Sequence, residues 1–133
     1  MERDIIVKIG RERYKTEIEV AQHKVYADEP KNLGGTDLGP SPAELLLSSL
    51  GTCKAMTLRM YADRKEWDLA SVEIKMSMSE QRTELQKTTF IHCHIRLHGD
   101  LDETQKGRLL LIADRCPVHK ILTSPIIIES NLV

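Results

Sequence analysis

A long, mostly apolar segment over residues 43–62 constrains the fold more than any other feature of this chain of 133 residues. Ser41 is a good N-cap, Pro42 suits the first helical position, and Glu44 follows Ser41 at capping-box spacing. The segment therefore predicts a helix, with Gly51 as a candidate bend or break. Apolar side chains surround this helix: Leu45, Leu46, Leu47, Leu50, Cys53, Ala55, Met56, Leu58 and Met60. Because a helix that is apolar all round is buried, we expect a central helix wrapped by sheet, including a partner subunit's sheet.

Alternating apolar and polar residues predict strands on both sides of this helix. Before it, we expect strands at 3–9, 14–20 and 23–27, and then a long irregular connection over 28–42 that is rich in glycine and proline. After it, we expect strands at 71–79 and 88–97, helices at 102–113 and 116–122, and a terminal strand at 126–129. This order predicts one α+β domain over residues 1–133 with a mainly antiparallel sheet.

The charge balance argues against nucleic acid or a membrane surface as a partner, since 19 basic residues face 20 acidic ones. No apolar stretch has the length of a transmembrane helix, and the amino terminus lacks a signal-peptide pattern. We therefore expect a cytoplasmic protein. Structural disulfides are rare in that compartment, so the three cysteines are expected to be catalytic, metal-binding or simply buried.

Cys53 and Cys116 stand in very different local surroundings. Cys53 lies within the apolar helical segment, whereas Cys116 is flanked by Arg115 and Pro117. A thiol reacts as its thiolate, which positive charge and a helix N-terminus both favour. The local sequence therefore predicts that Cys116 has the lower pKa of the two. Two thiols far apart in sequence suit a redox enzyme in which one attacks and the other resolves.

Cys93 and the histidines around it lie on a predicted strand. Period two places Cys93 with Ile95 and Leu97 on one face, which we interpret as the core face. The opposite face carries Arg96 together with His92, His94 and His98. These histidines suggest a metal site, but no CxxC or HExxH spacing occurs, and a solvated strand face is favoured. We expect no metal and no cofactor. His119, near Cys116 on a short helix, either holds a thiolate as a cation or is simply exposed.

Several motifs in order along nearly the whole chain resemble the OsmC/Ohr family, and most closely its less characterised OsmC-like branch. They are Gly39-Pro-Ser-Pro-Ala-Glu-Leu-Leu-Leu leading to Cys53, Thr57-Leu-Arg-Met-Tyr-Ala, Arg64-Lys-x-Trp, and Cys116-Pro-Val-His-Lys. The resemblance implies an intertwined homodimer with buried central helices and with active sites at the subunit interface. It also implies thiol-dependent reduction of organic hydroperoxides, without metal, haem or flavin.

The resemblance also implies roles for individual residues. Cys53 would attack the peroxide and become a sulfenic acid, Cys116 would form a disulfide with it, and an external dithiol would reduce that disulfide. The family thus assigns the first attack to Cys53, although the local sequence favours Cys116. The family's arginine corresponds to Arg11 or Arg13, and the alignment does not choose between them.

The family's catalytic carboxylate is the main departure. Aligned without a gap, its position is occupied by Ala43, and the following Glu44 is either catalytic or only a helix cap. The alternative reading is therefore a non-enzymatic protein of the same fold that binds small molecules or senses oxidants. A third reading is acyl transfer through a thioester on Cys53, which needs an oxyanion hole.

Overall fold

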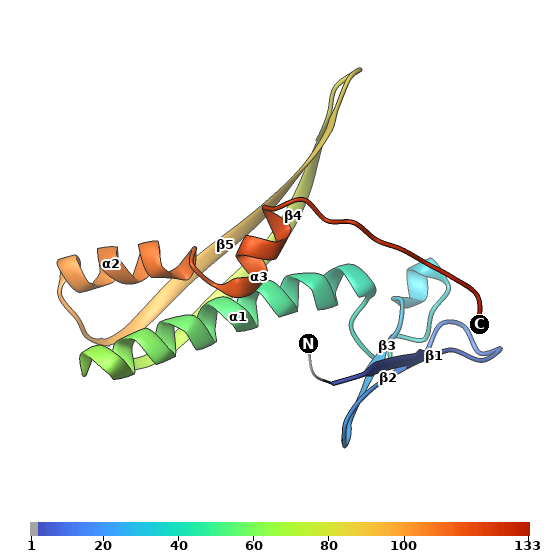
Figure 1. The fold of residues 1–133 in the computed structure, drawn as a ribbon, viewed down its shortest axis with the longest axis horizontal. Coiled ribbons are helices and arrows are strands. Elements are labelled where there is room, and N and C mark those ends of the chain that lie inside the picture. Colours follow the sequence, from blue (N-terminus) through green and yellow to red (C-terminus); the bar gives the residue numbers. More distant parts are fainter. Residues whose placement is uncertain (1–2) are drawn as a thin grey trace. The chain divides into compact units, whose positions relative to one another are not determined.

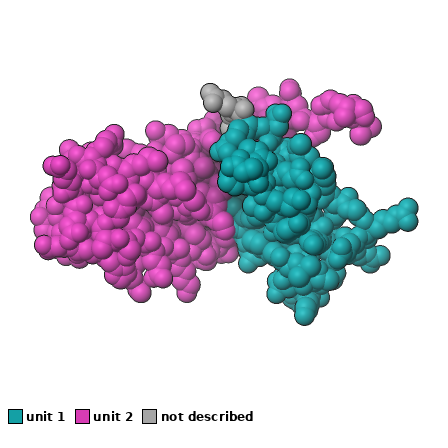
Figure 2. Space-filling model, turned by 90° about the horizontal axis from the view of Figure 1, so that it is seen from below, with its two compact units in different colours: residues 1–46 teal, residues 47–133 magenta. Residues whose placement is uncertain are grey.

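The computed structural model describes residues 3–133, which fall into two compact units divided between Leu46 and Leu47 (Figure 2). Unit 1 ends at Leu46, and unit 2 runs from Leu47 to Val133. Both contain antiparallel strands, and the three α-helices complete the α+β class that the sequence predicts (Figure 1). The described residues form two separate sheets rather than one. That residues 1–133 act as a single domain stays a prediction.

Unit 1 is built on a three-stranded antiparallel sheet. Its strands are β1 (Ile5–Lys8), β2 (Thr16–Val20) and β3 (His23–Ala27), in the order β1-β2-β3. The three predicted strands are confirmed, with the first two shorter than expected. The expected irregular connection follows, and it contains one short 3₁₀ helix, η1 (Lys31–Leu33).

The carboxylate of Asp28 orders this connection. Asp28 is only 2 % exposed, and it accepts hydrogen bonds from backbone N–H groups of Tyr14 (3.1 Å), Glu29 (2.7 Å) and Leu38 (3.2 Å). The hydroxyl of Thr36 donates a further bond of 2.6 Å. Because these donors stabilise the ionised form, above all the Thr36 hydroxyl, they hold the pKa of Asp28 well below its usual range despite burial. A buried carboxylate with this many donors fixes the path of the loop.

Helix α1 (Pro42–Lys65) is the long helix that the sequence predicts. Ser41 and Glu44 form the expected reciprocal cap, with Ser41 N–H donating to Glu44 Oε1 (2.9 Å) and Glu44 N–H donating to Ser41 Oγ (3.2 Å). Gly51 does not interrupt the helix.

The single chain buries only part of α1, so burial on all sides with the help of a partner subunit's sheet stays a prediction. Its buried residues are Leu50, Gly51, Lys54, Leu58, Tyr61 and Ala62. Met56 and Met60 are 56 % and 64 % exposed. The chain covers one face of the helix, and a second covering surface would have to come from outside it.

Unit 2 adds a long antiparallel hairpin and two further helices. The hairpin consists of β4 (Asp68–Arg82) and β5 (Lys87–Asp100), both longer than predicted, and α2 (Glu103–Ala113) and α3 (Pro117–Leu122) follow (Figure 1). The predicted strand at 126–129 is wrong, because no strand within residues 3–133 pairs with it. Ile127 and Ile128 remain 88 % and 85 % exposed, and Pro125 has no N–H to donate.

The core of unit 2 joins α1, α2 and the hairpin. Leu58 from α1 and Leu109 from α2 are fully buried, and Tyr61 packs edge-to-face on Trp67 with ring centroids 5.5 Å apart. The remaining members of this core are Ala62, Leu69, Ile112 and Ala113. Among the helices of residues 3–133, none combines the length and apolar character needed to cross a membrane.

A candidate two-thiol site

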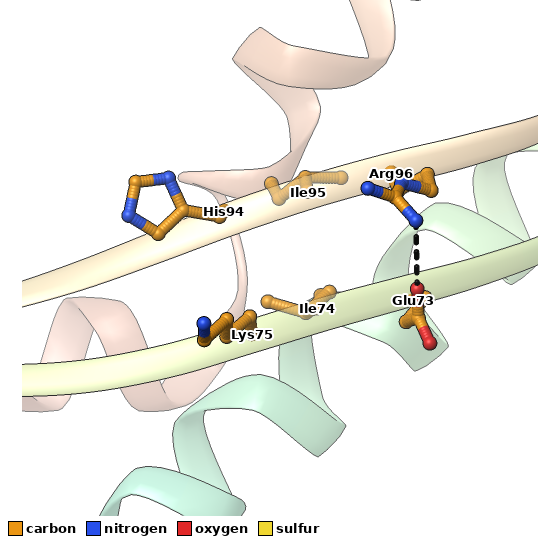
Figure 3. Close-up of a pocket in the computed structure, with 6 residues that line it drawn as sticks. All are labelled: Glu73, Ile74, Lys75, His94, Ile95 and Arg96. Atoms are coloured by element: carbon orange, nitrogen blue, oxygen red, sulfur yellow. Dashed lines mark ion pairs between the residues drawn. The ribbon is translucent and has the colours of Figure 1, made fainter.

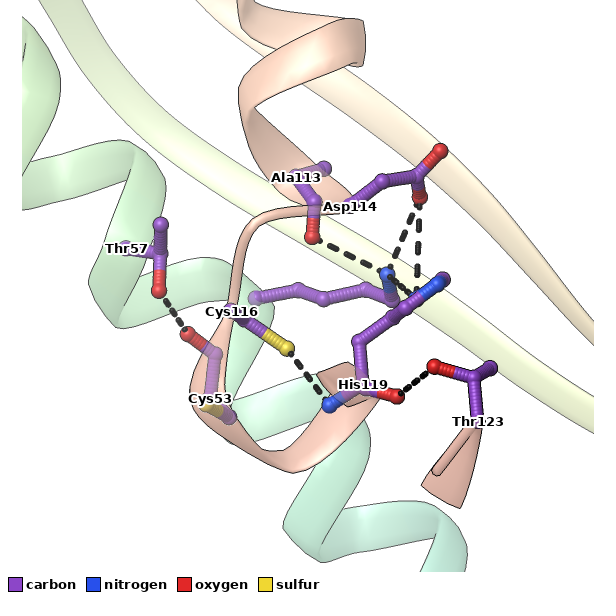
Figure 4. Close-up of polar contacts among 8 residues, drawn as sticks. Cys53, Thr57, Ala113, Asp114, Cys116, His119 and Thr123 are labelled. Carbon is purple, nitrogen blue, oxygen red and sulfur yellow. Dashed lines mark hydrogen bonds and ion pairs between the residues drawn. The ribbon is translucent and has the colours of Figure 1, made fainter. Parts of the chain in front are cut away.

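Helix α1 and the start of α3 bring Cys53 and Cys116 together in unit 2. Cys53 is half-buried in the middle of α1, where the Thr57 hydroxyl donates a 2.8 Å hydrogen bond to its carbonyl oxygen. Cys116 is fully buried and is the N-cap residue of α3. Its Sγ accepts the backbone N–H of His119 at 3.3 Å (Figure 4). Cys53 lies near enough to Cys116 to raise the pKa of its thiol, although the two residues are far apart in the sequence.

Burial raises the pKa of the Cys116 thiol above its ordinary value. The neighbouring Cys53 side chain adds to this increase in pKa, while the His119 N–H and the charge of Lys54 oppose it. The sequence-based expectation that the surroundings of Cys116 lower its pKa is therefore wrong. Arg115 is exposed, so the cation beside Cys116 in sequence does not offset the loss of water around its sulfur. A thiol kept protonated is better suited to a later step than to first attack.

Lys54 is the site residue that sequence reasoning missed. It is only 2 % exposed, and its ammonium donates to the carbonyl oxygen of Ala113 (3.0 Å) and to Asp114 Oδ1 (3.2 Å). The third contact, of 2.9 Å, is to Nδ1 of His119. Because an ammonium can only donate, Nδ1 is the acceptor in this contact. A lysine directly after Cys53 in an apolar helical run was the available signal.

His119 therefore contributes to the site in a different way from either prediction. Its ring turns to Lys54 and lies 3.8 Å from Asp114 Oδ1, and its backbone amide contacts Cys116 (Figure 4). It is neither a simple exposed histidine nor a cation paired with the thiol through its ring.

A pocket of about 410 Å³ adjoins this network within unit 2. Cys93 lines it and pairs across the hairpin with Met76. The predicted alternation on β5 is confirmed, with Cys93 half-buried and the neighbouring histidines exposed. The other residues that line the pocket are Leu50, Lys54, Thr89, Ile91, Asp114, His119, Leu122 and Thr123.

The outer face of the hairpin carries the exposed histidines His92, His94 and His98. His94 stands opposite Lys75, and Arg96 lies 3.6 Å from Glu73 (Figure 3). These four residues, with Ile74 and Ile95, line a hollow of about 490 Å³. Within the part of the chain that the structure describes, no group of three or more His, Cys, Asp or Glu side chains is placed to hold a metal ion.

The remaining predicted site residues belong to unit 1. Arg11 and Arg13 lie exposed in the connection between β1 and β2. Glu44 is held in its capping box, where the Ser41 N–H lowers the pKa of its carboxyl group. The site described here therefore consists of residues of unit 2 alone.

Comparison with known proteins gives one family. The model of the family described as OsmC-like protein matches residues 34–131. No curated protein matches the sequence. Among solved structures, an OsmC-like protein from Mycoplasma pneumoniae has a TM-score of 0.72 and 24 % identity, over 92 % of this chain and 87 % of that one.

Two further solved structures share the fold. An organic hydroperoxide resistance protein OsmC from Legionella pneumophila has a TM-score of 0.68 and 19 % identity, over 92 % of this chain and 90 % of that one. The organic hydroperoxide resistance protein OhrB of Bacillus subtilis has a TM-score of 0.64 and 18 % identity, over 92 % and 91 % of the two chains.

Proposed function

Since the chain belongs to the OsmC-like protein family, we propose that it is a thiol-dependent peroxidase that reduces organic hydroperoxides. The observation that supports this most is that α1 and the start of α3 place Cys53 near enough to Cys116 to raise the pKa of the Cys116 thiol. Cysteines that pair in a reaction must approach to a few ångströms, and a chance meeting of two motifs so far apart in sequence is rare. The hydroperoxide resistance named for the Legionella and Bacillus structures supports the same reaction class.

The proposed cycle uses Cys53 as attacking thiolate and Cys116 as resolving thiol. The Cys53 sulfur attacks the terminal peroxide oxygen, the O–O bond breaks, and the alkoxide takes up a proton and leaves as an alcohol. Cys53 is then a sulfenic acid. The Cys116 sulfur attacks the Cys53 sulfur, and its proton leaves with the displaced hydroxide as water. An external dithiol reduces the resulting disulfide and becomes a disulfide itself.

The order of the two thiols follows from the environment of Cys116. Burial and the contact with Cys53 keep Cys116 protonated, because both raise its pKa. A protonated, fully buried thiol is poorly placed to meet a peroxide first. It is well placed to meet a sulfenic acid that forms on the neighbouring side chain.

We also propose that the protein works as a homodimer in the cytoplasm. Large apolar side chains stay exposed on two helices of unit 2, with Met60 at 64 % on α1 and Leu111 at 61 % on α2. A second copy of the chain would cover such surface. The cycle needs a compartment that keeps dithiols reduced, as the cytoplasm does. Light scattering after gel filtration tests the dimer, and Met60→Lys should weaken it.

The decisive experiment follows peroxide consumption in a stopped-flow instrument with cumene hydroperoxide or hydrogen peroxide and a dithiol. We expect the wild type to turn over and to prefer the organic peroxide. Cys53→Ser should abolish turnover, and Cys116→Ser should allow one oxidation without recycling through the disulfide. Cys93→Ser is the matched control and should behave as wild type. Stoichiometric oxidation of the wild type without turnover would overturn the peroxidase and favour a sensor.

A further inference from the structure

Lys54 carries a buried positive charge to which the proposed thiol cycle gives no task. A buried ammonium is costly unless it is fully paired, and three acceptors surround that of Lys54, a residue only 2 % exposed. Its side chain therefore has one favourable position within unit 2.

The three acceptors bracket Cys116 in the sequence. Ala113 and Asp114 precede it at the end of α2, and His119 follows it in α3. One ammonium thus ties both flanks of the segment that carries Cys116. The same lysine is the next residue after Cys53 on α1. Lys54 therefore links the helix that carries Cys53 to the residues on both sides of Cys116.

We propose that Lys54 is a positioning residue that holds residues 113–119 against α1, so that Cys116 meets the Cys53 sulfenic acid before a second peroxide does. This inference rests on the proposed two-cysteine cycle. A sulfenic acid has two fates, condensation with a nearby thiol or further oxidation to a sulfinic acid. The first is intramolecular, so its rate depends on how often the two sulfurs stand in reacting geometry.

Lys54→Met tests this directly, because methionine keeps an apolar side chain of similar length and removes all three donors. Single-turnover oxidation of the reduced variant should form the sulfenic acid at a rate within about twofold of wild type. Disulfide closure should slow by about tenfold or more. Mass spectrometry should then find the Cys53 sulfinic acid at lower peroxide concentrations than in wild type.

Lys120→Met is the matched control. It removes the same charge from an exposed position in α3, next to His119, and should close its disulfide as fast as wild type. If Lys54→Met does not fold, Asp114→Ala tests the same positioning role more mildly. The Asp114 side chain is 69 % exposed and supplies one of the three acceptors, so we expect closure to slow by about threefold.

A peroxide-free measurement separates this inference from the function on which it rests. Reduced and oxidised glutathione in a defined ratio report the effective concentration of Cys116 at Cys53, which should fall about tenfold in Lys54→Met and stay unchanged in Lys120→Met. Equal values in wild type and Lys54→Met, or equal slowing of both oxidation steps, would overturn the positioning role and leave the peroxidase intact. If the effective concentration is about tenfold higher in wild type than in Lys54→Met but wild type does not turn over peroxide, the peroxidase function is overturned instead.

Discussion

The hydroxyl of Thr36 donates a 2.6 Å hydrogen bond to Oδ2 of Asp28, which ties one end of the irregular connection before α1 to its middle. The same carboxylate accepts hydrogen bonds from the backbone N–H groups of Glu29 and Leu38 in the connection. It also accepts one from Tyr14, in the loop between β1 and β2. Asp28 acts as the fixed point of a segment whose own regular structure is limited to the short helix η1. The stability of unit 1 should therefore depend on its charge.

Acid should weaken the protein through Asp28. Because its pKa is lowered in the folded state, Asp28 stabilises the fold fully above the ordinary aspartate pKa of about 4, and this stabilisation is lost as pH falls through the folded pKa. We expect Asp28→Asn to lower the melting temperature at pH 7 and to reduce its decrease on acidification. Thermal unfolding followed by circular dichroism measures both. The exposed Asp37→Asn in the same connection should change neither.

Glu44→Gln separates the two readings of Glu44. Glutamine keeps an oxygen that can accept the Ser41 N–H, so the cap should survive while the charge is lost. We expect kcat/KM for cumene hydroperoxide to stay within about twofold of wild type, since the carboxylate is occupied at the helix terminus. A loss of tenfold or more with an unchanged melting temperature would instead assign Glu44 to the chemistry.

Gly99 and Gly107 should respond oppositely to alanine. Gly99 has φ of +143°, and a Cβ there would collide with the backbone carbonyl oxygen of Asp68, next to the irregular pairing at Leu69 and Ser71. Gly99→Ala should cost about 1–3 kcal/mol. Gly107 lies exposed inside α2 with open space around it, so Gly107→Ala should stabilise by about 0.5–1 kcal/mol. Urea unfolding gives both values, and changes of the same sign would contradict this account.

Leu58→Ala should be strongly destabilising. Its side chain is fully buried between α1, α2 and the hairpin, and truncation leaves a cavity that costs about 2–5 kcal/mol. Leu85→Ala, at the 98 % exposed tip of the hairpin, is the matched control and should change the free energy of unfolding by less than about 0.5 kcal/mol. Equal effects of the two substitutions in chemical denaturation would place the core elsewhere.

Local patterns predicted most of the elements because the forces that decide them act over a few residues. Ser41 and Glu44 form their cap within one turn, and Cys93, Ile95 and Leu97 share a face because strands alternate. The predicted strand at 126–129 was wrong for the opposite reason. A strand exists only through its neighbour, and neighbours are set by tertiary structure.

The candidate site was harder to predict because its electrostatics are not local. Arg115 stands beside Cys116 in sequence but faces solvent, and burial raises the pKa of Cys116 instead. Lys54 was missed, since its acceptors come from residues 113–119, far from it in the sequence. The pairing of Cys53 with Cys116 was reached only through the resemblance of whole motifs, and their contact belongs to the folded chain.

The amide of His119 gives the protein an internal reporter of its redox state. This N–H donates to the sulfur of Cys116, which caps the first turn of α3. Loss of the sulfur's proton or a bond from the sulfur to Cys53 changes its strength as an acceptor, and so changes the chemical shift of the His119 amide proton. The cross-peak of this amide in a nitrogen–proton correlation spectrum of the labelled protein should therefore move at each stage of the cycle. Its intensities would give the fractions of the reduced and disulfide forms while the peroxide and the dithiol remain unlabelled.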